Sequence, residues 1–310
     1  MSEPDSWCTI IPLVDLYIGL KTPVCFSGGF LLTPIPDLLR QDDWTERLSA
    51  PDRKGLQGLL YAFVVEYEGP PADTLASRAE SPEAGAIQKA KHEIAQLANL
   101  AMWLARPSPV CFDLIFNAPR REGGWSVPFV EKTSRILCHP RDRGGLVSDS
   151  DLEEARNLHS ALCGLPAESS IRTAVHACWS ALQIEMAEVR YLLLWIALEA
   201  LFAPEDSPTR GPDLFARRIV QFNSADCRPA DDHYARARRA YLLKSRIAYG
   251  QRTEPADLAE CGHETESLLR GALRKILSSD DLTDLFSGTS GREDFLKGLV
   301  TDNSSRPADP

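Results

Sequence analysis

The eight cysteines of this 310-residue chain include no C-x-x-C pair. Such pairs supply most structural zinc sites, so we expect no metal and interpret the cysteines as reduced thiols. A Walker loop and a G-x-G-x-x-G motif are also missing, and the S-G-G of Ser27 to Gly29 indicates only a turn. We therefore expect no bound cofactor.

Long hydrophobic runs are equally scarce. The most apolar stretch, residues 191–203, spans 13 residues and contains a glutamate, which is too short to cross a bilayer. The first residues, M-S-E-P-D-S-W-C, form neither the basic nor the apolar region of a secretory signal. We therefore expect a cytoplasmic protein that does not insert into membranes.

Basic residues are outnumbered, with 34 Lys and Arg against 44 Asp and Glu and a formal net charge of −10. A surface that coats nucleic acid needs clustered positive charge, so we expect no DNA partner. A local basic site remains compatible with this balance. The hydrophobic content of 44% is that of a globular protein with a full core.

The chain changes character near residue 150. Before it, apolar and β-branched runs such as L-L-Y-A-F-V-V-E-Y alternate with turns and with one strong helix pattern over 81–105. After it, the spacing predicts helices throughout. We therefore expect an α+β protein with a mixed α/β N-terminal domain over 1–150, an all-α bundle over 151–300 and a disordered tail over 301–310.

Helix boundaries can be predicted within the C-terminal half. The long pattern over 169–202 is two helices or one bent helix, and Pro212 suits the first turn of the next. A further helix ends at Gly250, a favoured residue just past a helix end. We expect a polar loop after it, with the following helix starting near Glu264.

Glu199 is the exception in the apolar sequence L-W-I-A-L-E-A-L-F. An ionised carboxylate there is costly unless a cation reaches it. We predict a salt bridge with a basic residue of the helix that contains Arg217 or the helix that contains Lys244. Such a pair could simply join two helices, or it could orient a basic residue in a cleft.

Three arginines of the last long basic helix, Arg236, Arg239 and Arg246, share one face. In an acidic chain this asymmetry suggests an anionic partner or an acidic counter-face. For the outward-facing arginines, a solvated helix face is the favoured interpretation.

Four blocks in this half carry a resemblance: L-W-I-A-L-E-A-L-F, F-A-R-R-I-V, Y-L-L-K-S-R-I-A-Y-G and L-L-R-G-A-L-R-K-I-L. Together they resemble the C-terminal HEPN domain of the ApeA-like family over about residues 170–280, and the N-terminal region resembles that family more weakly. The resemblance implies a HEPN-like helical bundle in a prokaryotic defence or toxin-type protein. It also implies a homodimer and metal-independent RNA cleavage.

HEPN ribonucleases carry an Arg-x(4–6)-His motif, and K-S-R-I-A-Y-G lies on that segment with Ser245 and Gly250 matching. Lys244 stands in the arginine place and Tyr249 in the histidine place. Histidine can move protons near neutral pH and arginine grips phosphate with two parallel bonds. Lysine offers only a point charge, and a tyrosine phenol, with an ordinary pKa of about 10, is a poor general base.

The resemblance thus implies an RNA-associated protein that is inactive or weak as a ribonuclease. Lys244, Tyr249 and Glu199 would form the degenerate centre. The residues expected to contact RNA or another anion are Arg217, Arg218, Ser245 and Arg246. Two alternatives stay open: an active metal-independent endoribonuclease that uses Lys244 and Tyr249, and a non-enzymatic dimerisation or interaction module.

Overall fold

The chain is a mixed α+β protein that divides into two compact units, Met1–Cys163 and Gly164–Pro310. The computed structural model describes residues 5–13, 17–18, 22–40, 45–46, 48–69, 82–107, 114–121, 124–125, 129–132, 146–203, 211–224, 231–288 and 291–301. The tail expected to be disordered lies, from residue 302 on, outside the described residues. The two units are described separately.

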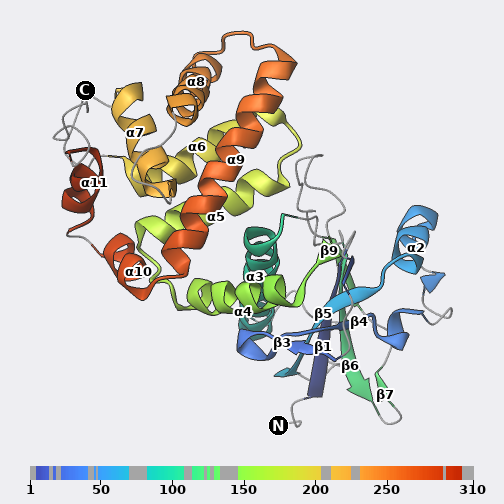
Figure 1. Cartoon of the computed structure of the whole chain (residues 1–310). Helices are drawn as coiled ribbons and strands as arrows, with labels where there is room; N and C mark the ends of the chain where they lie inside the picture. The colour runs from blue at the N-terminus through green and yellow to red at the C-terminus, as the bar shows by residue number, and fades with distance from the viewer. Residues whose placement is uncertain are drawn as a thin grey trace. The chain divides into compact units, whose positions relative to one another are not determined.

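A seven-stranded sheet forms the centre of the first unit (Figure 1). Its strands are β1 (Asp5–Leu13), β3 (Val24–Cys25), β4 (Leu31–Pro34), β5 (Tyr61–Gly69), β6 (Leu114–Arg121), β7 (Gly124–Trp125) and β8 (Phe129–Lys132). The order is β3-β4-β5-β1-β6-β7, and β8 also pairs with β6. A separate parallel pair joins β2 (Tyr17–Ile18) to β9 (Leu146–Val147).

β1 runs antiparallel between β5 and β6, so both of its edges are paired, and side chains from Trp7 to Leu13 are buried on both faces of the sheet. Cys8 and Ile10 point into one apolar cluster with Leu38, Leu56 and Phe116. On the opposite face, the Thr9 hydroxyl donates to Asn117 Oδ1 at 2.5 Å, so this polar pair is satisfied inside the sheet. The predicted buried strand at L-L-Y-A-F-V-V-E-Y is β5.

Two glycines make the turn before β4, as the S-G-G signal predicts. The short 3-10 turn η1 (Ser27–Gly29) contains Gly28 at φ 74° and Gly29 at φ 79°. Both values lie in the left-handed region that glycine adopts without strain. β3 and β4 then pair across this turn.

Within the described residues, the first unit also contains the 3-10 helix η2 (Asp37–Arg40) and the α-helices α2 (Ala50–Gln57), α3 (Pro82–Ala105) and α4 (Asp149–Gly164). The expected boundary near residue 150 assigns α4 to the helical half, whereas the compact units divide after Cys163. α4 packs within the first unit through His159, which is fully buried and whose Nε2 lies 3.2 Å from the Ile94 carbonyl oxygen of α3. The Phe26 ring also packs edge-on against it.

The second unit is helical (Figure 1). Its helices are α5 (Ser170–Gln183), α6 (Ala187–Phe202), α7 (Pro212–Asn223), α8 (Asp231–Ala248), α9 (Pro255–Leu277), α10 (Asp280–Ser287) and α11 (Arg292–Thr301). The pattern over 169–202 is thus two helices. α9 starts earlier than the sequence predicts, because Pro255 suits its first turn and Leu258 and Cys261 bury an apolar side.

α6 lies at the centre of this unit and packs against α5, α7, α8 and α9. Trp195 of α6 makes an edge contact with Tyr241 of α8 and a tilted contact with Phe215 of α7. These rings fix the spacing between three helices. No helix in the described part of the chain is both long and apolar enough to cross a membrane.

Candidate functional site

Glu199 and Lys244 meet between α6 and α8. Lys244 Nζ lies 2.5 Å from Glu199 Oε1, and the two side chains are 20% and 18% exposed. The ammonium also lies 5.2 Å from the centre of the Tyr241 ring. The predicted salt bridge of Glu199 is therefore confirmed. Lysine charge at this position is largely neutralised within the chain.

Tyr249 lies in a different environment. α8 ends with the Gly250 amide donating to the Ile247 carbonyl and the Gln251 amide donating to the Arg246 carbonyl, both at 2.9 Å. This is a Schellman helix end, with Gly250 at φ 70° in the left-handed region. Tyr249, just before this glycine, is 83% exposed. Its hydroxyl and the Lys244 ammonium therefore do not share a pocket within the described part of one chain.

The neighbouring motif residues are also placed by this helix end. Ser245 is half-buried, and its carbonyl accepts from the Tyr249 amide at 3.1 Å. Arg246 is exposed, and its Nη2 donates to the Arg252 carbonyl at 3.1 Å. On α7, Arg217 is exposed, with its guanidinium 5.6 Å from the centre of the Tyr234 ring.

Arg218 points into the interior of the unit and is only 2% exposed. Its Nη2 lies 2.7 Å from Glu293 Oε1, and its Nη1 donates to Glu293 Oε2 and to the Phe202 carbonyl, both at 3.2 Å. A solvent anion does not reach a guanidinium held in this way. The expected anion-binding role therefore fits Arg217 and Arg246 better than Arg218.

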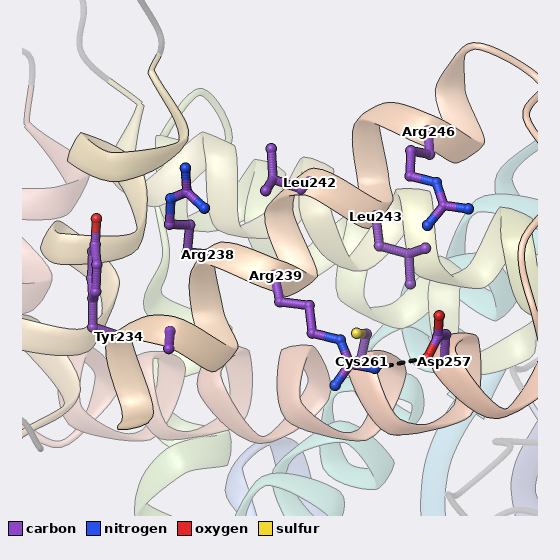
Figure 2. A pocket seen from close by; sticks show the side chains of 9 residues that line it. Tyr234, Arg238, Arg239, Leu242, Leu243, Arg246, Asp257 and Cys261 are labelled. Atoms are coloured by element: carbon purple, nitrogen blue, oxygen red, sulfur yellow. Dashed lines mark hydrogen bonds and ion pairs between the residues drawn. The ribbon is translucent and has the colours of Figure 1, made fainter. Parts of the chain in front are cut away.

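A groove of about 510 Å³ opens between α8 and α9 (Figure 2). Arg239, Leu243 and Arg246 extend from α8 toward α9, whereas Arg238 and Leu242 point away from it. Sequence reasoning placed Arg239 and Arg246 on one face but missed the groove. Cys261 forms part of the far wall of the groove. It lies within α9, which starts at Pro255 and so earlier than the sequence predicts. The residues lining the groove are Tyr234, Ala235, Arg238, Arg239, Leu242, Leu243, Arg246, Asp257 and Cys261.

The arginines along this groove differ in how they pair with carboxylates of the chain. Arg239 divides its guanidinium between Asp257 at 2.7 Å and Glu260 at 3.0 Å. Arg238 lies 2.6 Å from Asp213 of α7. Burial raises the pKa of the Cys261 thiol, although the nearby Arg239 opposes this shift. The thiol is therefore protonated near neutral pH and acts as an apolar wall rather than as a nucleophile.

Anion binding is the chemistry that these groups can perform. No cluster of three or more His, Cys, Asp or Glu side chains able to hold a metal ion occurs within the described residues. Exposed guanidinium groups next to apolar side chains offer charge-assisted hydrogen bonds together with a surface for an apolar body.

Comparisons of the chain with models of protein families, with curated proteins and with solved structures returned no match. Function is therefore inferred from the residues themselves and from the geometry around α6, α8 and α9.

Proposed function

We propose that this chain is a HEPN-like, RNA-associated protein of the prokaryotic defence or toxin type, inactive or weak as a ribonuclease. The observation that carries the proposal is the 2.5 Å contact between Lys244 and Glu199 at the degenerate motif. The position expected to neutralise the scissile phosphate is already neutralised by a carboxylate. A phosphate that approached Lys244 would have to compete with Glu199.

Proton transfer at the same segment is also poorly supported. The histidine position is taken by Tyr249, which is exposed to solvent. The histidine of α8 itself is His233, sixteen residues earlier and so about 24 Å away along the helix axis. General acid–base catalysis contributes about 10²–10⁴-fold, and it requires a group within hydrogen-bond reach. Background cleavage is therefore the expected activity.

The experiment measures cleavage of labelled RNA by the purified chain in the presence of EDTA. We expect background rates for the wild type and metal-independent cleavage for the double variant Lys244→Arg plus Tyr249→His. Lys244→Arg alone is the matched control, because it restores the guanidinium group of the motif without the imidazole. Rapid cleavage by the wild type that is lost in Tyr249→Phe would instead support the active-enzyme alternative.

Binding separates an RNA-associated protein from a purely structural module. We expect an RNA oligomer to bind with an affinity that falls as salt rises, since phosphate contacts release counterions. Absence of RNA binding at low salt would contradict the proposal even if the fold is intact. The chain would then be interpreted as an interaction module.

An exposed apolar stripe on α6 favours self-association as part of this function. Met186, Val189 and Ile196 are 62%, 38% and 47% exposed and follow each other at helical spacing. Two-fold dimers bury the same patch from both subunits, and such dimers are the commonest oligomers. We propose a homodimer through this stripe. Light scattering is expected to give a dimer mass for the wild type and a monomer mass for Ile196→Glu, with Leu242→Glu as a control.

A further inference from the structure

One face of α8, together with the groove between α8 and α9, combines exposed apolar side chains with exposed arginines. We propose that this surface docks an acidic amphipathic helix of a partner protein. The inference goes beyond the proposed function, because it concerns a protein partner and does not require that the chain bind RNA.

The α8 stripe consists of Arg238, Leu242, Arg246 and Tyr249, which follow one another at intervals of four, four and three residues. Residues at these intervals lie on one face of a helix. The Tyr249 amide still donates to the Ser245 carbonyl, so Tyr249 continues the helical spacing. Leu242 is 40% exposed and Tyr249 is 83% exposed. Cationic and apolar side chains therefore alternate along an open stripe.

The groove continues this stripe toward α9. Arg246 extends toward α9, whereas Leu242 points away from it, so Arg246 joins the stripe to the groove (Figure 2). The groove has a volume of about 510 Å³, and buried Leu243 and Cys261 contribute to its lining. Packed helices insert side chains of one between the ridges of the other. A helix lying along α8 can therefore contact the stripe and place an apolar side chain in the groove.

The spacing of the apolar residues favours a helical partner. Leu242 and Tyr249 are seven residues apart, which is about two helical turns or 10 Å. Residues i and i+7 of a helix alongside α8 have the same separation, so its apolar face can cover both side chains. Tyrosine and arginine are also among the residue types that contribute most to binding at protein interfaces.

Charge complementarity favours an acidic partner. The charged residues that line the groove are three arginines and Asp257, in a chain whose formal net charge is −10. Arg246 donates to the Arg252 carbonyl, and within the described residues no carboxylate lies within salt-bridge distance of it. A carboxylate of the partner can therefore pair with Arg246 without displacing a carboxylate of this chain.

The other two arginines already pair within the chain. Arg238 lies 2.6 Å from Asp213. Arg239 lies 2.7 Å from Asp257 and 3.0 Å from Glu260. The two arginine side chains are 45% and 51% exposed, and pairs this exposed contribute little to stability. Because a guanidinium has several N–H donors, both arginines can share them with partner carboxylates, whereas a basic partner would meet like charge.

Binding of a designed peptide, followed by fluorescence anisotropy, tests the surface. The probe is a labelled helical peptide of about 20 residues with leucine at every seventh position and glutamate three and four residues after each leucine. The same peptide with lysine in place of glutamate is the charge control. We expect only the acidic peptide to bind, and its affinity to fall as salt rises. Arg246→Gln and Leu242→Ser should each weaken binding roughly tenfold.

Two matched variants should leave the affinity for the acidic peptide unchanged. Arg236→Gln removes the same charge from the same helix, but Arg236 pairs with Glu264 and does not line the groove. Ile196→Ser removes an exposed apolar side chain from α6. Circular dichroism confirms that all variants are folded before their affinities are compared.

No binding of the acidic peptide, equal binding of both peptides, or unchanged affinity in Arg246→Gln and Leu242→Ser would overturn the inference. Competition with an RNA oligomer separates it from the proposed function. RNA that displaces the peptide and binds more weakly to the same variants would assign this surface to RNA, which supports the proposed function and overturns the inference. RNA that binds without displacing the peptide supports both. If the peptide binds and RNA does not, the proposed function fails and the inference holds.

Discussion

Within the described residues, the buried polar side chains of the first unit are all neutral, whereas the second unit buries charged side chains beside the neutral Ser169 and Thr265. Within the described residues, the buried polar side chains of the first unit are Thr9, Thr45, Asn99, Asn117 and His159. The buried charged side chains, Arg218 and Glu266, both belong to the second unit, where they pair with Glu293 and Arg190.

This difference reflects how each unit satisfies its backbone. In a sheet, backbone N–H and C=O groups pair between neighbouring strands. Few polar side chains are therefore needed around β1 to satisfy the backbone. Helix ends leave carbonyl groups unpaired, and the interior of the second unit satisfies them with side chains. Buried Arg218 donates to the Phe202 carbonyl at the end of α6. At the surface, exposed Lys275 donates to the Phe222 carbonyl of α7. The ionic interior therefore connects the helices to one another.

The largest expected effect comes from removing a buried charge in the second unit. Arg218→Ala removes the closest cation of Glu293, whose contact with exposed Lys297 is longer at 3.9 Å, and leaves the Phe202 carbonyl without this donor. We therefore expect a loss of about 3–5 kcal/mol in the free energy of unfolding. Urea unfolding followed by far-ultraviolet circular dichroism measures it. The exposed neighbour Arg217→Ala is the control and should change stability by only about 0.5 kcal/mol. Equal losses in both variants would contradict an ionic interior.

A smaller effect is expected at the half-buried pair. Glu199→Ala leaves Lys244 with the Tyr241 ring as its remaining neighbour, and because Lys244 is 20% exposed its ammonium can partly reach water. We expect a loss of about 1–3 kcal/mol. A double-mutant cycle with Lys244→Met checks the origin of this loss. If the two changes are simply additive, the contact does not stabilise the fold.

The smallest expected effect concerns the neutral interior of the first unit, and it is a dependence of the free energy of unfolding on pH. Burial lowers the pKa of His159 in the folded chain, although its bond to the Ile94 carbonyl opposes the shift. The unfolded chain takes up this proton near the ordinary pKa of about 6.5, so stability is lost as pH falls below that value. The loss is at most about 1.4 kcal/mol per pH unit.

Urea unfolding of the wild type and of His159→Gln, measured between about pH 7 and pH 5, checks this prediction. The wild type should lose stability more steeply than the variant over that interval. Parallel curves for the two proteins would show that His159 does not titrate differently in the folded and unfolded states.

The sequence could predict elements whose signals are local. The apolar run of β5, the S-G-G turn, Pro212 at the start of α7 and Gly250 at the end of α8 each depend on residues adjacent in the chain. The first turns of α9 were missed because their polar residues suggested a loop. Their helical state depends on burial of Leu258 and Cys261, which is a tertiary effect.

The candidate site divides in the same way. The salt bridge of Glu199 could be predicted, because a carboxylate among apolar residues requires a cation. The contrast between Arg217 and Arg218 could not, since adjacent residues on a helix point in directions about 100° apart and the partner Glu293 lies 75 residues away. The groove between α8 and α9 likewise depends on which helices become neighbours.

That separation of 75 residues also has a consequence for biosynthesis. The ribosome produces α7, which contains Arg218, well before it produces α11, which contains Glu293. Until α11 has been made, the guanidinium of Arg218 cannot pair with Glu293. At about 5–20 residues per second, Glu293 follows several seconds later. The interior of the helical unit can therefore lock only after α11 has been synthesised, and a chain interrupted before α11 would keep α7 in a form open to proteases.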